Sequence, residues 1–473
     1  MPLVIGLIKA SLPSYFPERH GVFDAALAAL EEIAGACGAR IVEAEGVPMT
    51  GAEAQQALDQ CRGQGAEFIL LLHGGFTMGD VARQIALSDL PIGVWATPEP
   101  GHEGDIQLNN FVSLNMSLSI ARGVRDLRRN PVQWYFGAPE DTALRARLGR
   151  SFRALSARAA LRDARVGVIG GLAPTFYNMA VSPDTLKRAT GVEPVHVDMH
   201  RLTATMAACG AEPVAQEVAA MAARAEVRGV SDAQMALTAR AALALRQIVA
   251  EDGFAGLAVS DWPALQDDPG MHPGAAFPWL EEVDNLPLAS EGDVLGTVTQ
   301  IVTRALTGRV GSLLDMTSPQ LDADRILMWH GGGGPLYMGG AEAAWINHPM
   351  IGRGTPDGPR FGAIADFVFP DGPHTVLRVA RSGSAAFGFE AEVRAGDESG
   401  FTGCRGWVTD FRSARGAHSA GDIVTSVMEH GLDHHFVLVP GSFASDFREF
   451  TAWMAMEPLE IISEHDGLAN GIG

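Results

Sequence analysis

Paired cysteines, long apolar runs and an excess of basic charge are all missing from this sequence. The four cysteines lie far apart and form no CxxC pair, which argues against zinc ribbons and thioredoxin-like chemistry and favours free thiols in a reducing cytosol. No run of 18 apolar residues occurs, so we expect no membrane span. The opening residues, MPLVIGLIKASLP, have no basic n-region and no obvious cleavage site, which predicts a first strand and not a signal peptide. We therefore expect a cytoplasmic protein.

The net charge also limits the classes of partner that the protein is expected to bind. A formal net charge of −21 repels phosphate backbones and anionic lipids, so we expect neither nucleic acid nor a membrane as a partner. Neutral substrates and bound cations are compatible with that charge. The 473 residues are 47% hydrophobic and 19% charged, an ordinary globular composition. At roughly 150 residues per domain, this length corresponds to about three domains.

The N-terminal third of the sequence alternates short apolar runs with helical patterns. Strands are expected at 3–8, 68–72 and 91–95, and a long polar helix over about 140–162. Uninterrupted apolar strands that alternate with helices indicate a parallel sheet covered on both faces.

A second unit of similar build follows. We expect its strands at 165–171, 194–198 and 256–262, and its helices at 213–224, 231–251 and 294–306.

The pattern changes after about residue 321. The segments 361–369, 374–380 and 387–394 alternate apolar and polar residues, which is typical of antiparallel strands. HHFVLVPG then reads as a strand and SDFREFTAWMAM as a helix. The predicted fold is therefore α/β: two doubly wound Rossmann-like domains (1–163 and 164–320), followed by a β-rich, antiparallel or barrel-like domain (321–473).

Several acidic residues lie where a site could form. An acidic turn with Glu291 and Asp293 precedes the helix at 294–306, either as an ordinary helix cap or as part of a site. Asp261 and Asp315 are each expected at the end of a strand. Ligands of open α/β sheets gather at the carboxyl ends of strands, so both are plausible site residues.

Three histidines are further candidates. His330 begins HGGGG, where glycines let the backbone approach a ligand, although a surface turn with an incidental histidine fits equally well. His434 and His435 precede an apolar strand. Neighbouring strand residues point to opposite faces, so at most one of the two is expected to face a given site.

Four ordered segments resemble the L-fucose isomerases and their L-arabinose relatives. SEGDVLGTVTQ resembles that family's CEGD-type segment, in which an aspartate follows the glutamate at a fixed spacing, and Asp315 follows Glu291 at the same spacing. WHGGGGP is similar to the family's HCG-type loop, and FGAIADFVFPDGPHTVLRVA to its β-domain pattern. DHHFVLVPG with SDFREFTAWMAMEPLEI resembles the C-terminal histidine segment and its helix. The N-terminal third matches mainly in architecture. Ser290 and Gly331 stand where the family has cysteines, and the chain is shorter, which leaves the sugar open.

The resemblance implies a metal site and an oligomer. Glu291, Asp315 and His435 match the family's metal ligands, and Mn²⁺ is the expected ion, with Mg²⁺ or Co²⁺ as alternatives. His330 matches a loop histidine that binds metal in the arabinose branch. The family forms homo-oligomers, often hexamers, with the active site near a subunit interface. The substrate-binding candidates are Arg19, His20, Asn110 and His330, with Lys9 and Asn109 as further hydroxyl or anion contacts.

The resulting hypothesis is a metal-dependent aldose–ketose isomerase that acts on a monosaccharide through a cis-enediol. A deoxyhexose, a pentose, a hexose and a sulfosugar all remain open. Glu291 is assigned as the catalytic base and Asp315 as its partner, and the two roles could be reversed. An anionic sugar would need a cation such as Arg19 or Lys9.

Two other functions compete with this hypothesis. The first is a non-catalytic two-lobe sugar-binding protein, which would need no stoichiometric metal. The second is an oxidoreductase that uses the glycines of VGVIGG or HGGGG, but the chain has no full GxGxxG and no acidic residue at the ribose position.

Overall fold

The computed structural model describes residues 2–127, 130–267, 272, 274–349, 362–394 and 399–467. The chain forms two compact units. The first contains Met1–Ala159 and Glu449–Ala455, and the second contains Ala160–Arg448 and Met456–Gly473. Both combine helices with sheets, which confirms the predicted α/β class.

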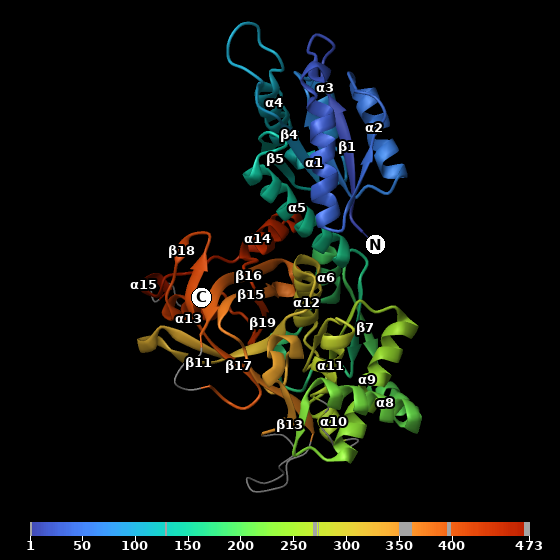
Figure 1. Cartoon of the computed structure of the whole chain (residues 1–473), viewed down its shortest axis with the longest axis vertical. Coiled ribbons are helices and arrows are strands. Elements are labelled where there is room, and N and C mark those ends of the chain that lie inside the picture. The colour runs from blue at the N-terminus through green and yellow to red at the C-terminus, as the bar shows by residue number, and fades with distance from the viewer. Residues whose placement is uncertain are drawn as a thin grey trace. The chain divides into compact units, whose positions relative to one another are not determined.

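The first unit is built on a five-stranded parallel sheet in the order β2-β1-β3-β4-β5. Figure 1 labels β1, β4 and β5 of this sheet together with helices α1 to α5. Every residue of β3 is buried, as expected for a parallel strand covered on both faces. The predicted long helix forms α5. The strands are β1 (Val4–Ala10), β2 (Arg40–Glu43), β3 (Phe68–His73), β4 (Ile92–Ala96) and β5 (Val132–Phe136), and the helices are α1 (Val22–Ala36), α2 (Gly51–Gly63), α3 (Gly79–Ala86), α4 (Asn110–Gly123) and α5 (Thr142–Leu161).

The sheet of the first unit has an apolar layer on each face. Ile69 and Leu71 of β3 belong to a cluster with residues of α2, α3 and α4. Phe68 points to the other face, where its ring lies 6.4 Å from Phe152 of α5 and 5.5 Å from Trp453. Because side chains alternate along a strand, one continuous apolar run supplies both layers.

The second unit contains a four-stranded parallel sheet in the order β10-β9-β6-β7. Its strands are β6 (Arg165–Ile169), β7 (Glu193–Val197), β9 (Gly256–Val259) and β10 (Leu288–Ala289). The helices of this part are α6 (Pro183–Thr190), α7 (Met199–Ala208), α8 (Ala211–Arg224), α9 (Asp232–Asp252), α10 (Ala264–Asp267), α11 (Ala276–Val283) and α12 (Val294–Thr307).

Six antiparallel strands of the second unit close into a barrel. In the order β16-β15-β19-β11-β12-β17 each strand pairs with the next, and β17 pairs back to β16. This ring confirms the predicted antiparallel, barrel-like region. The barrel strands are β11 (Ser312–Gln320), β12 (Arg325–His330), β15 (Gly372–Ala380), β16 (Ala385–Val393), β17 (Cys404–Ser413) and β19 (His435–Pro440).

Shorter strands extend the sheet that forms the barrel. The strand order β14-β13-β8 extends the sheet from β17, β18 pairs with β17, and β20 pairs with β16. These elements, with the last helices, are β8 (Glu226–Arg228), β13 (Ala344–Asn347), β14 (Ala363–Val368), β18 (Gly416–Ala417), β20 (Glu457–Pro458), α13 (Ala420–Glu429), α14 (Ala444–Met454) and α15 (Glu464–Gly467).

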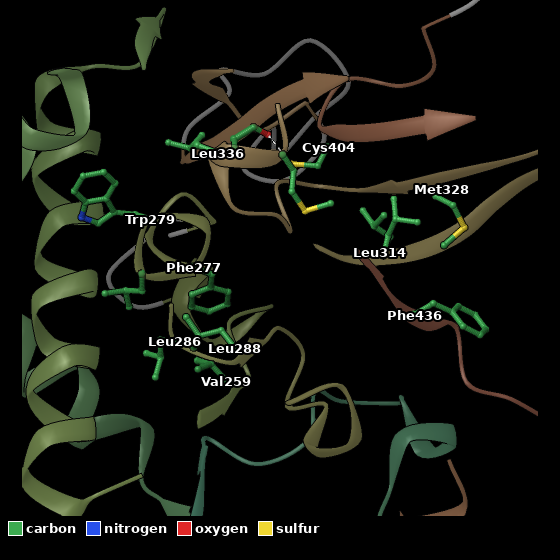
Figure 2. Packing of buried hydrophobic residues seen from close by; sticks show 14 of the residues in the cluster. Val259, Phe277, Trp279, Leu286, Leu288, Leu314, Met328, Leu336, Cys404 and Phe436 are labelled. Atoms are coloured by element: carbon green, nitrogen blue, oxygen red, sulfur yellow. Dashed lines mark hydrogen bonds between the residues drawn. The ribbon is translucent and has the colours of Figure 1, made fainter. Parts of the chain in front are cut away.

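The parallel sheet and the barrel share one apolar core. Figure 2 shows Val259 and Leu288 of the parallel sheet in the same cluster as Leu314, Met328 and Phe436 of the barrel. A continuous core of this kind explains why the two parts form a single compact unit. The predicted division of residues 164–473 into two domains near residue 320 is not tested by this shared core and stays a prediction.

Two further expectations concern cysteines and membranes. All four cysteines (Cys37, Cys61, Cys209 and Cys404) are free, as predicted. Among the helices of the described residues, none combines the length and the apolar character that crossing a bilayer requires.

Candidate metal and active site

Glu291 sits in a strained turn directly after β10. Its φ is 61° and that of Gly292 is 73°, so two consecutive residues adopt the left-handed conformation. A Cβ on Gly292 would lie 2.2 Å from the carbonyl oxygen of Gly171, which explains the glycine there. Backbone strain of this kind costs on the order of 1–3 kcal/mol and persists where the surroundings enforce it.

Asp261 is the main anchor of that turn. Its Oδ1 accepts the backbone N–H of Glu291 at 2.8 Å, and its Oδ2 lies 3.3 Å from Nε2 of His272. Burial raises the pKa of the Asp261 carboxyl, but the hydrogen bond and charge of His272 outweigh burial and leave this pKa below its usual value. Asp261 follows β9, so it lies at the carboxyl edge of the parallel sheet, as expected.

Asp315 reaches the site from the barrel and not from the end of a strand. The expectation that it ends a strand is wrong, because β11 continues to Gln320. In the antiparallel pairing of β11 with β19, Asp315 lies directly opposite His435. Side chains of such a pair project from the same face, so the strand register brings this carboxylate beside the imidazole.

The three predicted metal ligands meet at the Nε2 atom of His435. This atom lies 3.4 Å from Oε2 of Glu291 and 3.7 Å from Oδ1 of Asp315. His435 is fully buried, and neither its Nε2 nor Oδ1 of Asp315 has a hydrogen-bond partner among the described residues. A buried imidazole nitrogen without a hydrogen-bond partner, approached by two carboxylates, suits a divalent cation.

His330 joins this group. Glu291, His330 and His435 each offer one ligand atom, and these atoms lie within 4.8 Å of one another. Burial lowers the pKa of His330, which favours the neutral imidazole that a metal ligand requires. Its Nε2 also lies 3.4 Å from the hydroxyl of Ser290.

Both histidines of the doublet face the site, so the expectation that only one could do so is wrong. β19 begins at His435, and His434 precedes it, which frees His434 from strand alternation. The Nε2 of His434 lies 3.3 Å from Oε2 of Glu291, and the amide of Asn178 approaches its Nδ1 at 3.1 Å. With that amide as donor, His434 donates from Nε2 to the Glu291 carboxylate.

Asp293 caps a helix and also contacts a site histidine, so the two alternatives from the sequence do not exclude each other. It caps α12, since its Oδ1 accepts the N–H of Gly296 at 2.8 Å. Its Oδ2 lies 3.0 Å from Nδ1 of His435, and Arg378 pairs with both of its oxygens. Burial raises the pKa of Asp293, but Arg378 and His435 outweigh burial and hold it well below its usual range. Arg378 was not predicted from the sequence. The signal that could have identified it is a charged residue inside the otherwise apolar segment HTVLRVA.

Aromatic rings line the approach to Glu291. Phe176 lies 5.3 Å from the ring of His434 and 6.0 Å from that of Trp262. On the β12 side, the ring of Trp329 meets that of Phe401 edge-on at 6.4 Å and lies 6.4 Å from that of His330. Such rings offer flat apolar surfaces to the C–H faces of a sugar.

The other predicted substrate contacts lie in the first unit. Arg19 is exposed, and its guanidinium stacks on Phe16 at 4.2 Å with no carboxylate partner among the described residues. His20 contacts Gln107 at 3.3 Å. Asn110 is buried, and its amide donates to Thr97 at 2.9 Å.

Lys9 and Asn109, the further candidates for contacts with sugar hydroxyls or an anion, also belong to the first unit. Lys9 is paired with Glu43 at 2.8 Å, and the backbone N–H of Asn109 donates to Glu99. A lysine already paired with a carboxylate is less available to an anion than the unpaired guanidinium of Arg19.

The glycines of VGVIGG have a structural use. Gly170 and Gly171 both have positive φ, and the carbonyl oxygen of Gly171 packs against Gly292. Their positive φ accounts for these glycines without a dinucleotide, whereas the close approach of the Glu291 turn depends on Gly292, where an added Cβ would meet Gly171.

Comparison with known proteins adds independent information. No family model matches the chain. Sulfoquinovose isomerases of Priestia aryabhattai and Priestia megaterium are each 24% identical to it over 461 residues, which cover 94% of this chain and 97% of the relative. A sulfoquinovose isomerase of Alkalicoccus urumqiensis is 25% identical over 374 residues, or 79% of this chain and 81% of the relative.

The similarity extends over both units and nearly the full length of the two Priestia relatives. It therefore includes the N-terminal third of the sequence, where the motifs quoted above are weakest. The chain is a sugar isomerase that interconverts aldoses and ketoses, as predicted from its sequence.

Proposed function

We propose that this chain is a metal-dependent isomerase of the L-fucose/L-arabinose isomerase type whose substrate is sulfoquinovose or a closely related sulfosugar. The observation that carries the metal dependence is the approach of Glu291 and Asp315 to Nε2 of His435. This nitrogen and Oδ1 of Asp315 lack hydrogen-bond partners among the described residues. The sulfosugar is supported by relatives that bear the name sulfoquinovose isomerase.

Glu291, Asp315 and His435 would hold the ion, with His330 as a fourth ligand. The donor set of carboxylates and imidazoles suits Mn²⁺, with Mg²⁺ or Co²⁺ as alternatives. When bound, the ion supplies Lewis acidity toward the oxygens of the open-chain sugar.

The two carboxylates would carry the proton transfer. Glu291 would remove the proton from C2 of the aldose and leave the cis-enediolate. The hydroxyl proton on O2 would pass to O1, and a protonated Asp315 would deliver a proton to C1 to give the ketose. Glu291 and Asp315 can exchange the roles of base and acid, and the overall proton transfer stays the same. His434 donates a hydrogen bond to Glu291 and so orients its carboxylate toward the substrate.

Recognition of the sugar would combine stacking with charge. Phe176, Trp262 and Trp329 present apolar rings to the carbon skeleton. The sulfonate requires a cation, and Arg19 of the first unit is our candidate because it lacks a carboxylate partner among the described residues. His20 and Asn110 are proposed as further hydroxyl contacts. We also propose a cytoplasmic homo-oligomer, with a hexamer as the expected form and the active site near a subunit interface.

The test is a substrate screen. Protein stripped with EDTA is reloaded with Mn²⁺, Mg²⁺ or Co²⁺ and offered sulfoquinovose, L-fucose, L-arabinose and glucose, with ketose formation followed by NMR. We expect turnover of sulfoquinovose only with metal, and deuterium from D₂O in the product. Turnover that persists in EDTA would rule out the metal, and binding of sugar without turnover would favour a sugar-binding protein.

A further inference from the structure

The two imidazole nitrogens of His435 face different groups. Its Nε2 faces Glu291 and Asp315, whereas its Nδ1 faces Oδ2 of Asp293 at 3.0 Å. The ring is fully buried, so neither nitrogen is exposed to solvent. A neutral imidazole carries one proton, and the nitrogen that holds it cannot bind a metal.

The surroundings of Asp293 determine which nitrogen that is. Its carboxylate is fully buried, and its Oδ1 accepts hydrogen bonds from the N–H of Gly296 and from Nη2 of Arg378 at 3.1 Å. Its Oδ2 accepts from Nη1 of Arg378 at 2.6 Å. The remaining lone pair of Oδ2 points at Nδ1 of His435, and a carboxylate that accepts from an arginine is ionised and has no proton to give. The proton of this contact therefore belongs to Nδ1.

Arg378 keeps the carboxylate of Asp293 ionised. Its guanidinium is also fully buried and extends to a second carboxylate, Asp433, through Nε at 3.2 Å and through Nη2. One arginine thus holds two acidic groups, of which only Asp293 touches His435. A helix cap alone would need one oxygen of Asp293 and no arginine.

We propose that Asp293, held by Arg378, is a positioning residue that keeps the proton of His435 on Nδ1 and directs the Nε2 lone pair at the divalent ion. This inference rests on the proposed metal dependence. It extends the site beyond the ligands to a carboxylate–histidine pair, an arrangement whose loss typically weakens metal binding by about 10- to 100-fold in other metalloproteins.

The decisive variant is Asp293→Asn. Asparagine caps helices as well as aspartate does, so α12 keeps its cap. The amide, however, turns an N–H₂ toward either Nδ1 of His435 or Arg378, and the contact no longer holds the proton on Nδ1. We expect Co²⁺ and Mn²⁺ to bind roughly 10- to 100-fold more weakly by calorimetry. The visible spectrum of the Co²⁺ form should also change, because a nitrogen ligand is lost.

Asp433→Asn is the matched control. It makes the same chemical change on the other side of Arg378 and does not touch His435, so we expect metal affinity and the Co²⁺ spectrum to stay as in the unmodified protein. Circular dichroism and thermal unfolding in EDTA check that both variants fold. Equal losses of affinity in the two variants, or unchanged affinity in Asp293→Asn, would overturn the proposal.

One measurement needs no variant. In the Zn²⁺-loaded protein labelled with ¹⁵N-histidine, NMR should find the His435 proton on Nδ1, and a proton on Nε2 would refute the inference even if Asp293→Asn does not fold. If the unmodified protein binds none of these ions, the proposed metal dependence fails instead. In that case the Nδ1 proton of the metal-free protein still tests the contact with Asp293.

Discussion

Replacing Asp261 with alanine should both destabilise the protein and weaken its metal site. The side chain is 2% exposed and accepts the backbone N–H of Glu291 at 2.8 Å, which holds Glu291 at a φ of 61°. Alanine removes a hydrogen bond to a charged acceptor and leaves that N–H without its partner, so we expect a loss of about 2–3 kcal/mol in the free energy of unfolding. Asparagine keeps a neutral acceptor, and its cost should be about 1 kcal/mol.

The assay is urea unfolding in EDTA at neutral pH, combined with Mn²⁺ titration of the native protein. Asp198→Ala is the matched control, because Asp198 also follows a strand of this sheet and accepts a backbone N–H, that of His200, but is exposed. Loss of this ordinary helix cap should cost about 1 kcal/mol and leave Mn²⁺ binding unchanged.

If Asp261→Ala unfolds no more easily than Asp198→Ala and binds Mn²⁺ as tightly as the unmodified protein, the Glu291 turn does not depend on Asp261. A loss of stability with intact Mn²⁺ affinity would separate the two roles and leave only the structural one.

Three further perturbations test the site and the first unit. Glu291→Gln should lower kcat for the sugar roughly 100- to 10,000-fold, the range expected for loss of a general base. His73 is buried, and burial lowers its pKa from 6.5 to about 3. The unfolded chain therefore binds a proton that the folded one does not, and stability is lost as the pH falls below about 6.5 toward 3. Between pH 7 and about 5.5 the loss should be about 1 kcal/mol larger than in His73→Gln, measured by urea unfolding. Arg19→Gln should raise KM for sulfoquinovose roughly tenfold and leave KM for a neutral aldose unchanged, whereas Lys9→Gln should alter neither.

Each of these three expectations can fail clearly. Near-normal turnover by metal-loaded Glu291→Gln would remove Glu291 as the base. Parallel stability profiles of His73→Gln and the unmodified protein would mean that His73 titrates normally. If Arg19→Gln raised KM equally for charged and neutral sugars, its contact would not be with the sulfonate.

Local pattern was a good guide to the regular elements. The apolar run FILLL forms the buried strand β3, and the expected helix at 294–306 is α12 (Val294–Thr307). These elements follow from the period of apolar residues, which depends only on neighbours in the chain. The same reasoning failed for Asp315, because the strand that carries it continues past the apolar segment into polar residues that pair with β12.

The histidine doublet shows a second limit. Alternation predicts opposite faces for His434 and His435, but it applies only inside a strand, and β19 starts at His435. Where a strand begins is decided by pairing partners far away in the sequence, here β11 and β15. No local pattern carries that information.

From the amino-acid order alone came the α/β class, the barrel-like region and the sugar isomerase activity. The roles of Glu291 and Asp315, implied by the family resemblance, stay a prediction. Only the folded chain decides the partners of His435, because Asp293 lies 142 residues before it and Arg378 lies 85 residues after Asp293. Buried charges must find hydrogen-bond partners wherever the fold brings them, and such partners leave no periodic trace in the sequence.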